Sequence, residues 1–265
     1  MGSRTDANAA AVVNRPMARR RLPIGIQTFR EIREEGCYYV DNTAYARRLA
    51  DDAGKHYFLS RPRRFGKSLF VDTLKELYEG AEGLFRGLDV HDAWDWSRRH
   101  PVVRLSFGGG NFKRPDELRA SVLRQLDAAE RRARPGPFAR LLDAVRGHPP
   151  APSRDGPAPG RLAALLETLH RRSGRRVVVL VDEYDKPILD ALDEPAQART
   201  NRDDLRGLYG TLKDCDAHVE LSFITGVSAA DEGSVSLEDG AATPDPLCSG
   251  NASAACRNGA GTSRR

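Results

Sequence analysis

Four short apolar runs recur along the chain, and longer stretches of mixed character separate them. The runs are His56–Leu59, Val102–Phe107, Val177–Val181 and Val219–Thr225, and they are rich in β-branched and aromatic residues. Apolar runs of this length that alternate with helical patterns are typical of strands buried on both faces of a parallel sheet. The pattern therefore predicts an α/β fold whose sheet is mostly parallel.

The segments between these runs carry apolar residues at spacings of three and four, which places them on one face of a helix. In 68–79 these residues are Phe70, Leu74, Leu77 and Tyr78, and Gly80 follows as a stop signal. An earlier helix is predicted from a cap at Thr43 to Ala53. Three later helices are predicted from stripes of the same kind, at Leu118–Ala129, at Leu162–Leu169 and at 202–215. One apolar face on each helix predicts helices on both faces of the sheet.

Three stretches lack such patterns. Residues 1–21 form a basic lead that we expect to be disordered, and 147–160 is a Pro/Gly-rich segment that we interpret as a surface insertion. The final 229–265 contain no aromatic residue and no Lys, with Val235, Leu237 and Leu247 as the large aliphatic residues. Such a tail cannot bury enough apolar surface to offset its ordering entropy, so it is predicted to be disordered. The domain then occupies 22–228.

Composition narrows the class of protein without naming a partner. The 265 residues include 42 Lys and Arg against 37 Asp and Glu, a net charge of +5 that is too modest to indicate nucleic acid. The longest apolar run is far shorter than the roughly 20 residues of a membrane-spanning helix. The four cysteines, Cys37, Cys215, Cys248 and Cys256, lack the spacing of a zinc site. We expect a cytoplasmic protein with reduced thiols and no membrane contact.

The residues that follow the first strand carry the strongest chemical signal. Gly66-Lys67-Ser68 completes the second half of the phosphate-binding loop pattern GxxxxGK[ST], between a strand and a helix. In such loops backbone N–H groups surround the phosphates, Lys67 reaches the β and γ oxygens and the Ser68 hydroxyl coordinates Mg²⁺. Arg61 stands where the pattern has its first glycine. The phosphate-binding segment is predicted to consist of Arg63, Arg64, Phe65, Gly66, Lys67, Ser68 and Leu69.

Two carboxylates end the third apolar run. Asp182 is predicted to hold Mg²⁺, and Glu183 to orient and polarise the attacking water. Both stand at the carboxyl end of a buried strand, where open α/β sheets bind ligands. Together with the phosphate-binding loop and an intervening strand at Val102–Phe107, they predict a P-loop NTPase that uses a catalytic glutamate.

Weaker features have an ordinary structural interpretation beside a functional one. Thr225 at the tip of the fourth strand is a candidate sensor of the γ-phosphate, although a threonine at a strand end is more often structural. Arg63 and Arg64 pair equally well with a nucleotide, with DNA or with carboxylates of the chain. The triple glycine Gly108–Gly110 is predicted to be a flexible turn.

The motifs RPRRFGKS (Arg61–Ser68), YVDNT (Tyr39–Thr43), VVLVDEYDKPI (Val178–Ile188) and FITGVS (Phe223–Ser228) resemble the prokaryotic AAA-ATPase-like family. The resemblance covers about 22–228 and implies an ATP-binding P-loop fold, with Lys67, Ser68, Asp182 and Glu183 in the roles given above. Members of this family commonly carry a PD-(D/E)XK nuclease-like domain after the ATPase part. No Lys of this chain follows an acidic residue at the (D/E)xK spacing, so that nuclease chemistry is not expected here.

After Ser228 the resemblance ends, and we expect an AAA-like core that lacks its last strand, which leaves His56–Leu59 as an exposed edge. A frameshift near codon 229 is our hypothesis for the change, so the chain is interpreted as truncated. Three functions stay open: Mg²⁺-dependent ATP hydrolysis, a nucleotide-binding switch or scaffold without turnover, and a basic DNA-binding module with a vestigial loop. A homo-oligomer and a nucleic-acid or protein partner also stay open, and an arginine finger would come from a neighbouring subunit or the missing region.

Overall fold

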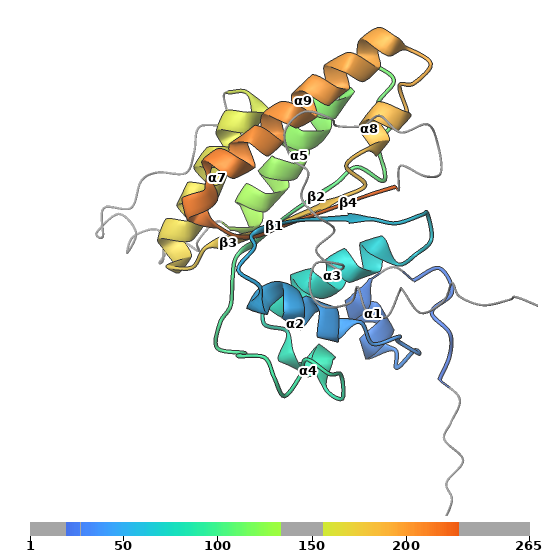
Figure 1. Cartoon of the computed structure of the whole chain (residues 1–265), viewed down its shortest axis with the longest axis vertical. Coiled ribbons are helices and arrows are strands. Elements are labelled where there is room, and N and C mark those ends of the chain that lie inside the picture. The colour runs from blue at the N-terminus through green and yellow to red at the C-terminus, as the bar shows by residue number, and fades with distance from the viewer. Residues whose placement is uncertain (1–19, 27, 134–155, 228–265) are drawn as a thin grey trace, which may run out of the picture.

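The computed structural model describes residues 20–26, 28–133 and 156–227, and these form a four-stranded sheet with helices on both faces (Figure 1). The strands are β1 (His56–Ser60), β2 (Val102–Ser106), β3 (Val177–Asp182) and β4 (Val219–Gly226). All of them are parallel, in the order β1-β4-β3-β2. The prediction of an α/β fold with a parallel sheet is therefore confirmed.

Two groups of helices cover the two faces of the sheet (Figure 1). One face carries the helices of the first part of the chain, namely α1 (Phe29–Glu34), α2 (Thr43–Asp51), α3 (Lys67–Tyr78) and α4 (Glu82–Phe85). The other face carries α5 (Glu117–Arg132), α7 (Ala158–Ser173), α8 (Lys186–Leu189) and α9 (Pro195–Asp214), with the short 3₁₀ helix η1 (Asp216–His218) leading into β4. Each face has its own hydrophobic cluster.

Strand alternation decides which side chains share a face. In β3, Val177, Val179 and Val181 pack toward α5, α7 and α9, whereas Val178 and Leu180 pack toward α3. Since successive side chains of a strand point to opposite faces, Asp182 is on the α3 face as well. This alternation brings the last side chain of β3 to the same side of the sheet as the helix that follows β1.

Three element boundaries differ from the sequence prediction. The helix predicted at 202–215 begins seven residues earlier, at Pro195, because its first two turns are anchored by polar Asn201 rather than by an apolar stripe. The end of the predicted insertion 147–160 overlaps α7, which begins at Ala158 and carries Pro159 in its first turn, where proline is tolerated. Thr43 is the first helical residue of α2 and not its cap; its N–H and hydroxyl both donate to Asp41 Oδ1.

Most of the lead, the insertion and the tail lies outside the described residues, as do Cys248 and Cys256. Cys37 and Cys215 are free thiols. In the described part of the chain β1 has a single neighbour, β4, so the opposite edge of β1 is unpaired there.

Candidate functional site

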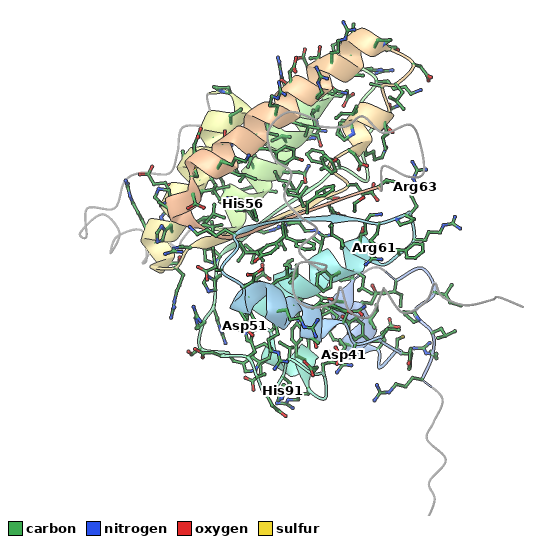
Figure 2. The ribbon with its side chains drawn as sticks, viewed as in Figure 1. Asp41, Asp51, His56, Arg61, Arg63 and His91 are labelled. Atoms are coloured by element: carbon green, nitrogen blue, oxygen red, sulfur yellow. The ribbon has the colours of Figure 1, made fainter. Side chains whose placement is uncertain are left out.

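The loop between β1 and α3 encloses the lysine of the phosphate-binding pattern. Lys67 is 7% exposed, and its Nζ donates to the carbonyl oxygens of Arg61 at 2.6 Å and of Pro62 at 2.9 Å. The ammonium thus satisfies two donors on its own loop and holds the loop closed around itself. Figure 2 shows Arg61 and Arg63 where β1 ends, at the opposite end of the strand from His56.

Two left-handed residues make the loop turn without a glycine at its first position. Arg64 has φ 68° and Gly66 has φ 75°, and Gly66 is the N-cap residue that directly precedes α3. The backbone conformation is what Gly66 supplies, since a Cβ there would meet no described atom within 4 Å. The five residues Arg61, Arg63, Arg64, Phe65 and Gly66 are exposed, whereas Ser68 and Leu69 are half-buried.

Asp182 lies at the end of β3, beside the end of β4. It is 3% exposed, and its Oδ1 accepts a hydrogen bond of 2.7 Å from the Thr225 hydroxyl. Thr225 is itself fully buried, and its Oγ1 also accepts the N–H of Glu183 at 3.3 Å. Thr225 therefore holds both acidic residues. Thr225, the predicted candidate sensor of the γ-phosphate, thus donates its one hydroxyl proton to Asp182 in this structure.

Glu183 turns the chain sharply away from the sheet. Its φ of 55° is unusual for a residue with a side chain and costs on the order of 1–3 kcal/mol, as is common at functional sites. Burial, and then the charge of Asp182, raise the pKa of its carboxyl, while Lys186 and Lys67 lower it through their charges. The Arg61 N–H at the start of the loop donates to the Gly226 carbonyl at 3.3 Å and the Glu183 N–H donates to Thr225 Oγ1, so the loop and the strand-end glutamate both lie beside the carboxyl end of β4.

Gly108, predicted to be part of a flexible turn, lies against this carboxylate. A Cβ at Gly108 would be 3.2 Å from Oε2 of Glu183, and a Cβ at Gly110 would be 2.0 Å from the ring of Phe112. Side chains therefore pack closely on Gly108 and Gly110, whereas a Cβ at Gly109 would meet no described atom within 4 Å. The structure has the predicted turn at Gly108 and Gly109.

Asp185 is a further acidic residue at this edge, outside the set predicted from the motifs. Its Oδ2 accepts the N–H of Val227 at 2.8 Å, and its buried Oδ1 has no hydrogen-bond partner among the described residues. Burial raises the pKa of Asp185, and the charges of Lys67 and Arg63 oppose the rise. The DEYD sequence that contains it was the available signal.

Arg104 and Asp72 complete the surroundings of Asp182. Arg104 of β2 donates from Nη1 to Asp72 Oδ1 of α3 at 2.8 Å, and its Nη2 lies 3.8 Å from Asp182 Oδ2. The other oxygen of Asp72 accepts the N–H of Phe29, the first residue of α1, at 2.8 Å. An arginine inside the otherwise apolar run VVRLSF was the sequence signal for this contact.

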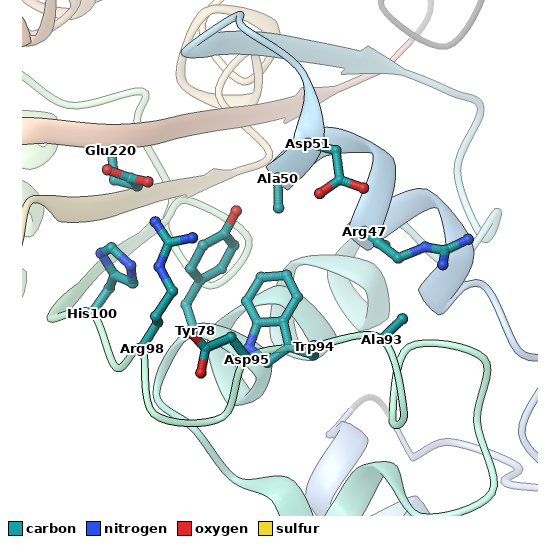
Figure 3. A pocket seen from close by; sticks show the side chains of 10 residues that line it. All are labelled: Arg47, Ala50, Asp51, Tyr78, Ala93, Trp94, Asp95, Arg98, His100 and Glu220. Carbon is teal, nitrogen blue, oxygen red and sulfur yellow. The ribbon is translucent and has the colours of Figure 1, made fainter.

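A cavity of about 150 Å³ lies near the amino ends of the strands, whereas the loop after β1 and Asp182 lie at the carboxyl ends. Arg47, Tyr78, Trp94, His100 and Glu220 are among its lining residues (Figure 3). His100 precedes β2 and Glu220 is the second residue of β4, so the cavity lies at the amino ends of the strands. It belongs to a different part of the molecule from the phosphate-binding loop.

Membrane spans and metal clusters are both absent from the described residues. No helix there is long and apolar enough to cross a membrane. No group of three or more His, Cys, Asp or Glu side chains there could hold a metal ion by itself.

The parallel sheet, the loop after β1 with Gly66-Lys67-Ser68 at its junction with α3, and the acidic end of β3 are features of a P-loop NTPase-like core. Residues 23–236 match the family described as "Predicted AAA-ATPase", and the chain belongs to this AAA-ATPase-like family. The resemblance inferred from the motifs is thereby confirmed.

A relative in Azotobacter chroococcum mcd 1, described as "Uncharacterized protein in vnfD 5'region", is 52% identical over 213 residues. The match covers 80% of this chain and 38% of the relative, so the chain spans less than half of the relative's length. No solved structure matches the chain.

Proposed function

We propose that the chain binds ATP with Mg²⁺ at the edge where β1, β3 and β4 end, and that it hydrolyses the γ-phosphate. One observation carries the proposal: Lys67 is buried in the loop after β1, and the Arg61 N–H of that loop bonds Gly226 of β4 while the Glu183 N–H bonds Thr225 at the end of the same strand. A buried ammonium beside a glycine-containing turn and a helix start is suited to phosphates. Membership of the AAA-ATPase-like family supports the same function.

The residues around Asp182 are suited to Mg²⁺ because they offer hard oxygen donors. Ser68 lies in the first turn of α3 and supplies a hydroxyl, and Asp182 Oδ2 accepts no hydrogen bond from any described residue. Since Mg²⁺ keeps several waters and takes ligands from phosphates, one carboxylate and one hydroxyl suffice from the protein. The ion would neutralise charge that develops on the phosphate oxygens.

The chain's own residues have separate roles in the proposed binding and hydrolysis of ATP. Lys67 exchanges the carbonyls of Arg61 and Pro62 for the β and γ oxygens, and the exposed Arg63 and Arg64 stand beside the nucleotide. Glu183 accepts the proton of the attacking water, for which a raised pKa makes it a stronger base. Thr225 positions Asp182 and Glu183 through its hydroxyl and does not itself contact phosphate.

Phosphate release and nucleotide binding test the proposal together. Purified full chain is compared with Glu183→Gln and Lys67→Ala, and with Arg119→Met as a control, because Arg119 in the first turn of α5 pairs with Asp204 of α9, on the face of the sheet opposite α3. We expect Glu183→Gln to bind ATP without releasing phosphate and Lys67→Ala to lose binding. Binding without turnover in the unaltered chain would instead favour a nucleotide-dependent switch. Salt-dependent DNA binding that ignores ATP would favour a DNA-binding module.

A further inference from the structure

We infer that Arg104 is a positioning residue for the candidate Mg²⁺ site, whose guanidinium supplies the positive charge beside Asp182 until the metal binds there. The inference rests on the proposed function and goes beyond it by assigning a role to a residue outside the phosphate-binding motifs. Because the guanidinium competes with Mg²⁺ at Asp182, Arg104 also raises the Mg²⁺ concentration that nucleotide binding requires.

The contacts of Arg104 place its charge between two buried carboxylates. Asp72 and Asp182 are 5% and 3% exposed, and a buried carboxylate without an opposite charge is strongly disfavoured. Arg104 Nη1 donates to Asp72 at 2.8 Å, a charge-assisted hydrogen bond, whereas its approach to Asp182 at 3.8 Å is an ion pair that no hydrogen bond locks. The guanidinium is therefore hydrogen-bonded to Asp72 and forms an ion pair with Asp182 without a hydrogen bond.

Strand alternation puts the charge on the right side of the sheet. Val103 and Leu105 pack toward α5, so Arg104 lies on the α3 face with Asp182. Asp72 follows Ser68 by four residues on α3, which places these two side chains on one face of that helix. Arg104 consequently lies beside Asp182 and contacts, through Asp72, the face of α3 that carries Ser68.

The anchor of Arg104 is fixed from its other side. Phe29 is fully buried against the rings of Tyr39 and Phe85, and its N–H donates to Asp72 Oδ2. An N–H in the first turn of a helix has no partner within that helix, so α1 gains a bond that holds the Asp72 carboxylate in place. When Mg²⁺ approaches Asp182, the guanidinium has a second carboxylate on which to remain.

Removal of the arginine and removal of the anchor should shift the Mg²⁺ requirement in opposite directions. Without Arg104 the ion meets no competing cation, so Arg104→Met should lower the half-saturating Mg²⁺ concentration by about three- to tenfold. With Asp72→Asn the guanidinium loses its charged anchor and pairs more fully with Asp182. The half-saturating Mg²⁺ concentration should then rise.

The experiment titrates Mg²⁺ at a fixed concentration of an ATP analogue with a β,γ-imido bridge and measures nucleotide binding to the full chain by calorimetry. Arg104→Lys keeps the charge and should stay near the unaltered chain. Arg119→Met removes an arginine from the opposite face of the sheet and should change nothing. General destabilisation would weaken binding in both variants and could not produce shifts of opposite sign.

The outcomes separate this inference from the proposed function. An unaltered chain that shows no Mg²⁺-dependent nucleotide binding would overturn both. An Mg²⁺ requirement that is unchanged or higher in Arg104→Met, while the unaltered chain binds normally, would overturn the role of Arg104 alone. If Arg104→Met does not fold, Arg104→Gln is measured in its place: a lower requirement supports the inference, and an unchanged or higher one contradicts it.

Discussion

Replacement of Thr225 by valine probes the buried contact that joins the ends of β3 and β4. The substitution keeps the shape of the side chain and removes a hydroxyl that donates to Asp182 at 2.7 Å and accepts from Glu183 N–H at 3.3 Å. A hydrogen bond to a charged group contributes about 1.5–3 kcal/mol, and an orphaned buried N–H costs about 1 kcal/mol or more. We therefore expect Thr225→Val to lower the free energy of unfolding by about 2–4 kcal/mol.

Urea unfolding followed by circular dichroism measures this loss, with two matched controls. Thr225→Ser keeps the hydroxyl and loses one methyl group, so it should cost about 1 kcal/mol. Ser222, three residues earlier on β4, is 1% exposed and its Oγ has no partner among the described residues, so Ser222→Ala should be close to neutral. A Thr225→Val variant no less stable than Thr225→Ser would refute the reasoning that the hydroxyl holds the two acidic residues.

Three further predictions concern charged and titratable side chains. The raised pKa of Glu183 means that its ionised form opposes folding, so Glu183→Gln should raise the midpoint of thermal unfolding at pH 7, and the gain should vanish as the pH falls below 4.5. Burial, and then the charges of His218 and Arg176, lower the pKa of His170, so the unfolded chain binds a proton at this residue more tightly than the folded chain does. The free energy of unfolding should therefore fall as the pH drops through 6.5. In urea titrations at several pH values, His170→Gln should reduce this dependence of stability on pH. Arg161→Met would leave Glu130 buried without its partner at 2.6 Å and should lower the free energy of unfolding by about 3 kcal/mol or more in chemical denaturation; a neutral result would contradict the importance of this ion pair.

The hydrophobic pattern predicted the sheet well because the strands are buried on both faces. All six residues of β3 are buried, and a short, continuous run of β-branched residues is typical of a central strand in a parallel sheet. The start of α9 was missed because Asn201, rather than an apolar residue, anchors its first turns through bonds to the carbonyls of Phe112 and Pro187. The spacing of apolar residues cannot reveal a helix start that a polar side chain holds in place.

The candidate phosphate-binding loop and the acidic end of β3 could be predicted because each is a motif of adjacent residues in the sequence. Arg104 was not, because its meaning depends on Asp72 and Asp182, which are far from it in the sequence and meet it through the strand order β3-β2 and the packing of α3. The buried position of Thr225 likewise follows from the pairing of β3 with β4. Local motifs therefore indicated which groups could act, and the fold shows what holds them in place.

Calorimetric binding of ATP to the full chain, with and without Mg²⁺, tests the central claim most directly when it is repeated on Lys67→Ala. The account predicts saturable binding that Mg²⁺ strengthens and that Lys67→Ala abolishes, with an unfolding curve for the variant close to that of the unaltered chain. Equal binding by Lys67→Ala and the unaltered chain, or no binding by either, would contradict the assignment of this sheet edge as a nucleotide site.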